Sequence, residues 1–219
     1  MAQGYNKAAE LPQVIPVFPL PGAILLPRGQ LPLNIFEPRY LNMIDDAMAG
    51  DRMIGMIQAI GGPRRLPSLA AVGCAGRITS FAETSDGRYL ITLTGICRFR
   101  VTNEMPSQTP YRQVRASFAS FEPDLTADKG GEDFDRETFL GALKAYLERR
   151  QLEIDWDTAQ AAPQEALCNS LAMALPFEPA EKQALLEAAT LQDRCSVLTA
   201  LMRIDAAETG DDDTPSSIQ

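Results

Sequence analysis

The sequence predicts an α+β protein: a small, twisted, mixed β-barrel with one inserted helix, followed by a C-terminal helical bundle. Three observations predict this fold class. Apolar runs of strand length fill most of residues 14–121. One apolar stripe at helical spacing interrupts them between residues 38 and 50. The composition changes sharply at Glu122, and beyond it the apolar residues recur only at helical spacing.

The first predicted strand is broken by prolines. Residues 14–20 are mostly apolar, but the prolines in and just after this run lack a backbone donor. We therefore expect an edge or irregular strand rather than a central one. These prolines are Pro16, Pro19 and Pro21.

A second extended segment, Leu31–Phe36, leads into the inserted helix. Turns at Gly22 and Gly29 allow the chain to reach it. Pro38 suits the first helical position, where a missing N–H costs nothing, and Gly50 can close the helix. One face of this helix is apolar and carries Tyr40, Met43, Ile44, Ala47 and Met48.

Five further strands follow. Gly73 and Gly76 indicate a bulge or a close approach of backbone within a strand. Asp86-Gly87 predicts a two-residue hairpin turn, and Gly95 breaks the return strand. The predicted strands are Met53–Ala59, Val72–Glu83, Tyr89–Thr94, Ile96–Thr102 and Tyr111–Phe121. The Gly/Pro-rich residues 61–67 are a loop, either a plain surface connection or a place of partner contact.

The segment from Glu122, EPDLTADKGGEDFD, is acidic and without periodicity, which predicts a linker. Four helices follow, two of which can open at Pro163 and Pro179. The predicted division is a mobile N-terminus (1–12), a β-rich lobe (13–121), the linker (122–133), a four-helix lobe (134–205) and a mobile acidic tail (206–219).

Several of these motifs resemble the N-terminal, substrate-binding domain of Lon-type ATP-dependent proteases. They are FPLPG, LPLNIFEPRY, VGCAGRITSF with GRYLITLTGICRFRV, and EKQALLEAATLQDRCSVL. The resemblance covers roughly residues 12–204 and is nearest to free-standing bacterial proteins that consist of this domain alone. It implies a PUA-like pseudo-barrel and a protein-binding role.

The composition excludes most catalytic machinery. The chain has no histidine, which removes Ser–His–Asp and Cys–His nucleophiles and imidazole metal ligands. It has neither a GxxxxGK[ST] motif nor a GxGxxG motif. A Ser–Lys dyad needs a desolvated lysine, and we expect Lys129, Lys144 and Lys182 to lie in solvated segments and Lys7 in a polar tail. The sequence therefore predicts a protein that is not an enzyme and needs no cofactor.

Metal binding is not predicted either. The four cysteines, Cys74, Cys97, Cys168 and Cys195, are scattered without a CxxC pair, so we expect buried thiols. Asp45-Asp46 and Asp211–Asp213 are not interleaved as in a calcium loop and are expected to be solvated charges.

The charge is unevenly distributed and argues against nucleic acid. Residues 1–121 carry 12 Lys and Arg against 8 Asp and Glu, whereas residues 122–219 carry 8 against 21. A nucleic-acid-binding protein usually presents a clustered basic face. A PUA-like nucleic-acid-binding domain nevertheless stays open as an alternative, and its candidate contacts are Arg77, Arg98, Arg100, Arg112 and Arg115.

No apolar run reaches the roughly 20 residues of a membrane span, and the first residues do not form a signal peptide, so a cytoplasmic protein is expected. The favoured hypothesis is a module that binds protein or unfolded peptide segments, in partnership with a separate ATP-dependent protease. A third reading is a peptidase-related protein by resemblance only. The candidate binding residues are Pro19, Leu20, Pro21, Phe36, Arg39 and Tyr40, because aromatic residues and arginine dominate binding hot spots.

Two interpretations remain for the entrance of the inserted helix. In the structural one, Glu37 favours the helix N-terminus electrostatically, Arg39 pairs with a carboxylate and Tyr40 covers apolar surface. In the functional one, these residues belong to the binding surface.

Overall fold

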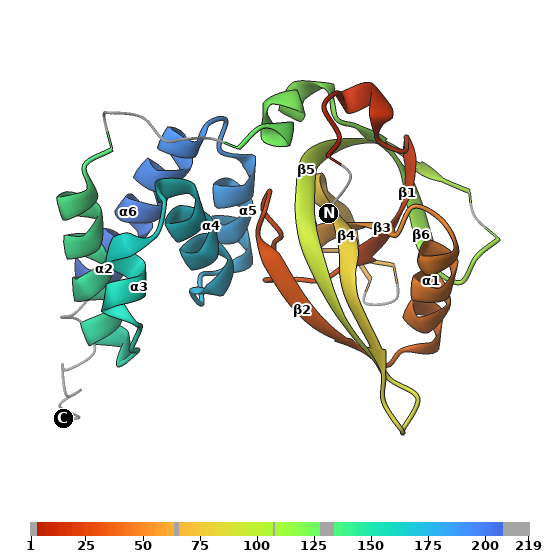
Figure 1. Ribbon diagram of the computed structural model, residues 1–219, viewed down its shortest axis with the longest axis horizontal. Helices are drawn as coiled ribbons and strands as arrows, with labels where there is room; N and C mark the ends of the chain where they lie inside the picture. Colours follow the sequence, from red (N-terminus) through yellow and green to blue (C-terminus); the bar gives the residue numbers. More distant parts are fainter. Residues whose placement is uncertain (1–3, 64–65, 107, 128–133, 208–219) are drawn as a thin grey trace, which may run out of the picture. The chain divides into compact units, whose positions relative to one another are not determined.

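The computed structural model describes residues 4–63, 66–106, 108–127 and 134–207, and they adopt the α+β fold that the sequence predicts. A six-stranded sheet has the strand order β2-β5-β4-β3-β1-β6, and a further pairing of β5 with β6 closes five of these strands into a ring. Figure 1 shows the strands curving around this ring. The strands are β1 (Val14–Pro19), β2 (Gln30–Ile35), β3 (Met53–Ala59), β4 (Leu69–Glu83), β5 (Tyr89–Met105) and β6 (Arg112–Ser117).

Strand β1 lies between β3 and β6, so the prediction that it is not a central strand was wrong, but its pairing is irregular, which was one of the two predicted possibilities. It pairs in parallel with β3 over residues 17–19 and antiparallel with β6 over residues 14–17. Because backbone groups alternate in direction along a strand, the nitrogen of Pro16 faces β3 before that pairing begins. The nitrogen of Pro19 faces β6 after that pairing has ended. Each proline therefore lacks its backbone N–H at a position where the neighbouring strand is not paired with β1.

Strands β4 and β5 are long and pass close to other backbone. A Cβ on Gly73 would lie 2.6 Å from the carbonyl oxygen of Met56, and the register with β5 shifts between Ala75 and Gly76. The predicted close approach and bulge are therefore both present. Gly95, predicted to break the return strand, lies inside a continuous β5. A Cβ there would lie 2.0 Å from the carbonyl oxygen of Leu26.

The hairpin between β4 and β5 is longer than the sequence predicted. Strand pairing ends at Glu83 opposite Tyr89, which leaves residues 84–88 in the connection instead of a two-residue turn. Gly87 has a φ of 77°, which only glycine adopts readily, and the Thr84 hydroxyl accepts from the backbone N–H of Arg88. The extra residues form this side-chain bond, which the Asp-Gly pattern does not reveal.

Helix α1 (Pro38–Ala49) has the predicted bounds, with Pro38 in its first turn and Gly50 at its C-cap. Its buried residues are Tyr40, Met43, Ile44 and Ala47. They are four of the five predicted for its apolar face, and they cover one side of the ring beside β1. This burial supplies the main stabilisation of a helix of this length, which would be marginal alone.

The start of the predicted linker is ordered. Residues 119–125 form the short 3-10 helix η2 (Ala119–Leu125), where a continuation of the last strand and then a linker were predicted. Phe121 and Asp124 in η2 are buried. Asp124 accepts hydrogen bonds from the backbone N–H and the guanidinium of Arg98 in β5, at 2.8–3.0 Å. The buried cation of Arg98 thus holds a segment that was predicted, from its acidic composition, to be a solvent-exposed linker.

The chain divides into two compact units, here called the sheet unit (residues 1–128 and 169–187) and the helical unit (residues 129–168 and 188–219). The helices after η2 are α2 (Arg136–Arg150), α3 (Trp156–Ala161), α4 (Gln164–Ala174), α5 (Pro179–Glu187) and α6 (Leu191–Ala207). Four helices were predicted here; α3 was missed because its six residues contain only one buried side chain, Ala159.

The boundary between these units differs from the predicted lobes, because residues 169–187 belong with the sheet. The buried amide of Gln58 donates to the carbonyl of Pro179 at 2.8 Å and to the side chain of Gln183 at 3.1 Å. Arg98 donates to the carbonyl of Leu186 at 3.1 Å. These polar contacts tie α5 to β3 and β5, which hydrophobic periodicity cannot show. That the chain contains separately folding domains stays a prediction.

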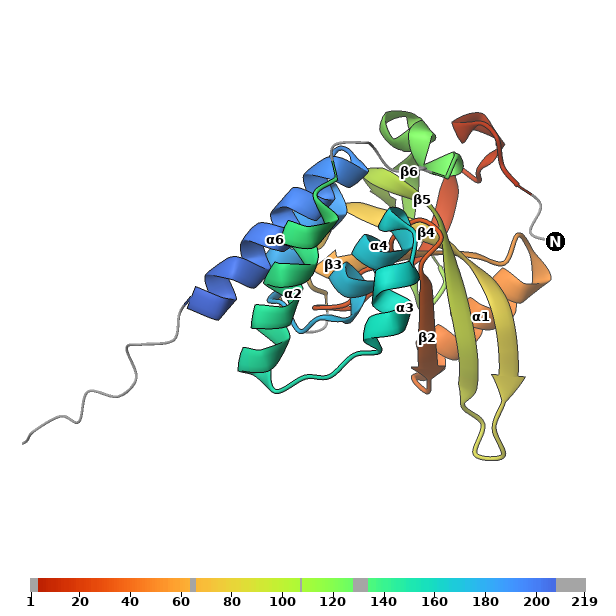
Figure 2. The same ribbon diagram turned by 60° about the vertical axis from the view of Figure 1, so that its left-hand side comes forward.

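In the helical unit, α2 and α6 lie side by side, as Figures 1 and 2 both show. Arg149 and Arg150 at the end of α2 both form ion pairs with Asp205 of α6. Asp135 caps α2 by accepting from the backbone N–H of Thr138 at 2.9 Å. Two arginines and one carboxylate thus join the two longest helices of this unit, and such pairing is favoured near a helix C-terminus.

The ends of the chain test two further predictions. Residues 1–12 were expected to be mobile, yet Leu11 is buried and the backbone N–H of Ala8 donates to Glu122 at 2.8 Å. The described part of this segment is therefore held against η2. Of the predicted mobile tail, residues 208–219 lie outside the described residues.

All four cysteines are buried thiols, as the sequence predicted. Burial raises the pKa of the Cys97 thiol to about 12, so the thiolate needed for reaction is scarce at neutral pH. Within the described residues, no helix is both long and apolar enough to cross a bilayer.

The Arg98–Asp124 pair provides a test of how the segment after β6 is held. Replacing Asp124 by Ala leaves a guanidinium that is 4% exposed without its carboxylate. We expect the free energy of unfolding to fall by about 3–5 kcal/mol, measured by chemical denaturation. Glu122→Ala in the same 3-10 helix is the control, and it should cost roughly 1 kcal/mol because its side chain is exposed. Equal losses in both variants would contradict this assignment.

Candidate binding pocket

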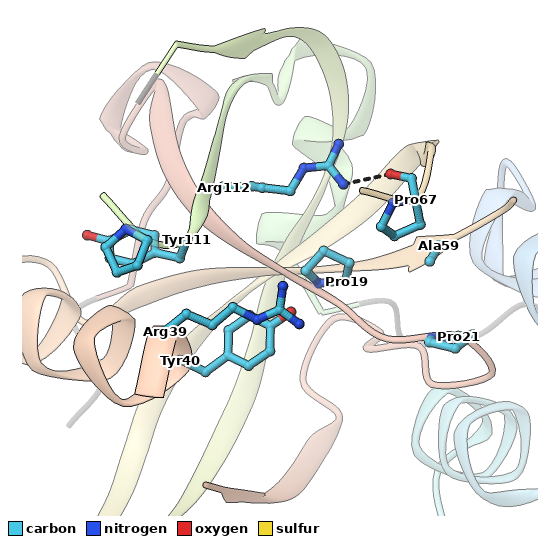
Figure 3. A pocket seen from close by; sticks show the side chains of 9 residues that line it. Pro19, Pro21, Arg39, Tyr40, Ala59, Pro67, Tyr111 and Arg112 are labelled. Carbon is cyan, nitrogen blue, oxygen red and sulfur yellow. Dashed lines mark hydrogen bonds between the residues drawn. The ribbon is translucent and has the colours of Figure 1, made fainter. Parts of the chain in front are cut away.

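A pocket of about 310 Å³ opens in the sheet unit where β1 and β6 separate. Figure 3 shows its lining side chains, with α1 on one side and the ends of β1, β3 and β6 around the others. Most of its wall is proline, tyrosine and alanine. Its lining residues are Pro19, Pro21, Arg39, Tyr40, Ala59, Pro67, Pro110, Tyr111 and Arg112, and we call it the proline pocket.

The pocket exists because the pairing of β1 with β6 stops. The last paired residues are Val17 and Arg112, and the chain beyond them carries Pro19 and Pro21 on one side and Pro110 on the other. Proline has no N–H to continue the ladder. The gap therefore stays open, and its walls present ring carbons and carbonyl groups rather than backbone donors.

Two arginines line the proline pocket, and each is neutralised by a glutamate outside it. Arg39 pairs with Glu37 at 2.9 Å. Arg112 donates to both carboxylate oxygens of Glu104, at 2.6 and 2.7 Å, and also to the carbonyl of Pro67. The hydrogen bonds from Arg112 hold the pKa of Glu104 below its usual value. The guanidinium groups thus contribute flat surfaces and donors with little net charge.

Tyr40 forms the base of the pocket and belongs largely to the core. It is 6% exposed, and its ring meets that of Phe18 edge-on at 4.4 Å between centroids. The guanidinium carbon of Arg39 lies 4.5 Å from the centre of the same ring. Burial raises the pKa of Tyr40. The predicted covering of apolar surface by Tyr40 and the predicted pairing of Arg39 with a carboxylate are both present; Glu37 is the N-cap residue but makes no side-chain cap bond.

Tyr111 forms another wall and is anchored to α1. Its hydroxyl donates to Asp46 at 2.6 Å, and burial together with this bond raises its pKa. Asp45, the other acid of the pair, accepts from the Tyr89 hydroxyl at 3.0 Å. The two neighbouring carboxylates therefore hold α1 to β6 and β5 instead of being only solvated charges. In the described part of the chain, no group of three or more acidic or cysteine side chains could hold a metal ion.

The structure brings four of the six predicted binding residues together: Pro19, Pro21, Arg39 and Tyr40 line the proline pocket. Leu20 is half-buried but does not line it. Phe36 is 62% exposed at the end of β2, where Arg88 lies 6.0 Å from its ring centre. Leu20 does not line the pocket because successive side chains of an extended segment point to opposite sides. Phe36 does not line it because the chain turns into α1 directly after this residue.

Most of the opposite wall of the pocket was not predicted as part of a binding site. Ala59, Pro67, Pro110 and Tyr111 were not proposed as binding residues, and Arg112 was considered only for nucleic acid. They lie more than 35 residues along the chain from Pro21, so only strand pairing brings them to it. The one available signal was the loop 61–67, for which partner contact had been one of two readings.

The five arginines proposed for nucleic acid do not act alike. Arg98 is buried against Asp124, and Arg112 is paired with Glu104. Arg115 donates to the side chain of Gln13 at 3.4 Å. Two of the five are thus neutralised by carboxylates within the sheet unit, which weakens the electrostatic argument for this alternative.

Lys182 is the exception to the predicted solvated lysines. It is 5% exposed, and burial lowers its pKa. Its ammonium group donates to the carbonyl of Met173 near the end of α4, at 2.7 Å, instead of to a serine hydroxyl. Its environment is therefore that of a cation satisfying a helix C-terminus.

The sequence and the fold correspond to a known family of substrate-binding domains. Residues 14–203 match the family described as the ATP-dependent protease La (LON) substrate-binding domain. The match covers most of the chain, so the chain belongs to this family, as the motifs suggested.

Relatives and solved structures agree with this assignment. Lon protease 2 of Myxococcus xanthus is 26% identical over 210 residues, which are 91% of this chain and 24% of that protein. The Lon N-terminal domain protein of Xanthomonas campestris has a TM-score of 0.60 at 24% identity, covering 85% of this chain and 97% of that one. The N-terminal domain of the Mycobacterium avium complex Lon protease has a TM-score of 0.61 at 17% identity, covering 86% and 97%. The chain thus spans about a quarter of that full-length protease and has the fold of the isolated domains.

The burial of Tyr40 predicts its mutational behaviour. Tyr40→Ala removes a ring packed on Phe18 and should lower the free energy of unfolding by about 3–5 kcal/mol, measured by thermal or chemical denaturation. Tyr40→Phe keeps the ring and should stay within about 1 kcal/mol of the parent. A Tyr40→Ala protein as stable as the parent would show that the ring is not part of the core.

The tyrosines also predict alkaline behaviour. Tyr40, Tyr89 and Tyr111 have raised pKa values in the folded chain, whereas an unfolded tyrosine titrates near pH 10. The folded form therefore keeps protons that the unfolded form releases, so stability is present below about pH 10 and falls as pH rises above it. In the folded protein, part of the tyrosinate absorbance should appear only well above pH 10. This late part should be smaller in Tyr111→Phe, which lacks one of the three tyrosines with a raised pKa. Uniform titration near pH 10 would contradict this.

Proposed function

We propose that the protein is a non-catalytic module that binds segments of other proteins, and that the proline pocket holds an apolar side chain of the bound segment. The observation that carries the proposal is the composition of the pocket. Its walls are proline, tyrosine and alanine, and its two cations are neutralised from outside. Such a pocket suits an uncharged side chain with a flat or apolar surface.

Membership in the substrate-binding family supports this proposal. The bound segments would be unfolded or locally exposed stretches, as in protein quality control, and an ATP-dependent protease on a separate chain would be a partner. Lon protease 2 of Myxococcus xanthus is about four times as long as the region that it matches. Its activity therefore enters here only as a proposed context, with the cytoplasm as the expected location.

A catalytic role has less support. The chain lacks histidine, and the buried Lys182 is engaged with a backbone carbonyl. Nucleic-acid binding has less support too, because Arg98 and Arg112 are paired with carboxylates. We therefore propose neither ATP hydrolysis nor peptide cleavage for this chain.

Occluding the pocket tests the proposal. Ala59 lines the proline pocket at the end of β3, so Ala59→Leu would place a branched side chain in the space of the ligand. We expect the affinity for a glycine–serine peptide with one central Phe to fall by at least about tenfold, the loss typical of one hot-spot contact. NMR titration measures the affinity and reports which backbone amides shift.

The matched control is Ala82→Leu, at an exposed position of β4 that does not line the pocket. It should bind the Phe peptide as the parent does, and both variants should bind the corresponding Ala peptide weakly. Unchanged affinity in Ala59→Leu, or shifted amides confined to residues far from the pocket, would refute the assignment of the site.

A further inference from the structure

A second hollow adjoins the proline pocket and has the opposite charge. It encloses about 260 Å³, and Tyr111 lines both hollows, so that its side chain separates them. The charged residues lining the proline pocket are Arg39 and Arg112, whereas those lining the second hollow are Asp46 and Asp51. We call it the acidic hollow; its other lining residues are Pro12, Val14, Ile15, Pro16, Ala47, Met53 and Gln113.

The two carboxylates of the acidic hollow are available to a ligand. Asp46 and Asp51 are both exposed, and in the described part of the chain neither forms an ion pair. Asp46 accepts one hydrogen bond, from Tyr111, which leaves further lone pairs on its carboxylate. Asp46 and Asp51 therefore differ from Glu37 and Glu104, which form ion pairs with the two arginines of the proline pocket.

The remaining walls of the acidic hollow are apolar or uncharged. Val14 is 39% exposed, unusually high for a valine in a central strand. The nearby cation is Arg115, which lies opposite Val14 in the β1–β6 pairing and donates to Gln13. Arg52 follows Asp51 in the chain but does not line the hollow. A ligand here therefore meets apolar surface first and negative charge at the α1 side.

We propose that the protein binds extended segments in which an apolar side chain, held in the proline pocket, is followed or preceded at short distance by a lysine or arginine, held in the acidic hollow. This inference rests on the proposed function and adds the charge of the recognised segment. The charge complementarity between a basic side chain and the two unpaired carboxylates is its basis, and the apolar stem of lysine or arginine suits the surface around Val14 and Pro16.

The spacing of the two groups follows from β1. Pro19 lines the proline pocket and Pro16 lines the acidic hollow. Three residues of strand separate them, which is about 10 Å at the rise of an extended chain. Because successive side chains of an extended chain point to opposite sides, an extended ligand reaches both hollows with side chains two or four residues apart, which is about 7 or 13 Å.

Peptides that differ in one residue test this inference. A capped glycine–serine peptide carries Phe and, two or four residues away, Lys, Gln or Glu, in both sequence orders. We expect the Lys peptide to bind about three- to tenfold more tightly than the Gln peptide, and the Glu peptide most weakly, as for exposed ion pairs with two carboxylates. The difference should shrink as salt is added. NMR titration measures each dissociation constant.

Variants of Asp46 and Asp51 test whether the acidic hollow causes the preference for the Lys peptide. In Asp46→Asn with Asp51→Asn the Lys and Gln peptides should bind equally, and the amide of Asn can still accept from Tyr111. The matched control is Asp45→Asn, which removes a neighbouring charge of α1 that does not line the hollow and should keep the preference for Lys. Thermal denaturation of each variant checks that the fold is kept.

The outcomes separate the two proposals. If the three peptides bind the parent protein equally, with shifts at the proline pocket, the charge preference is wrong and the proposed function stands. If the preference for Lys persists in the double variant, the acidic hollow is not its source, and the inference is likewise wrong. If no Phe peptide binds, the proposed function is wrong, and the inference that rests on it is wrong as well.

Discussion

The buried pair of Arg98 and Asp124 is the interaction on which the sheet unit depends most. Arg98 donates to both carboxylate oxygens of Asp124 and to the carbonyl of Leu186. Its guanidinium carbon also lies 4.6 Å from the ring centre of Phe121. One guanidinium thus joins β5, η2 and α5, which are far apart in the chain. A buried cation costs several kcal/mol to desolvate, and here five donors in a fixed fork can be matched to partners. The geometry suits arginine and excludes lysine.

Closure of the sheet explains where the pocket lies. The ring needs β1 to pair with β3 and β6, and Val17 is the residue of β1 that is paired with both strands. The pairing of β1 with β6 ends at Val17, so the two strands separate before Pro19, and the space between them is lined partly by prolines, which lack a backbone donor. A pocket at this point follows from the requirement to close a sheet through a proline-rich strand.

Much of the fold could be predicted from local sequence. Helix α1, with Pro38 and Gly50 at its ends, and strand β3 have the predicted bounds, because their signals are confined to a few neighbouring residues. The central position of β1 and the ordered η2 could not be predicted. Both depend on partners distant in the chain, namely β6 and Arg98. The same reason explains the pocket. The part contributed by the first 40 residues was predicted, and the part contributed by Ala59, Pro67, Pro110, Tyr111 and Arg112 was not.

The charges around the pocket show why counting arginines misleads. The first half of the chain has a net positive charge, and most of its cations are arginine. In the folded chain Arg39 lies over the ring of Tyr40 and pairs with Glu37, and Arg112 donates to the Pro67 carbonyl and pairs with Glu104. Their positive charge is balanced a few ångströms away, so they shape an apolar pocket more than they attract anions. Asp46 and Asp51, which line the neighbouring acidic hollow, form no ion pair in the described part of the chain. Under the proposed function, such a surface would discriminate among ligands by the sign of a neighbouring side chain, since like charges repel and unlike ones attract over the same short distance.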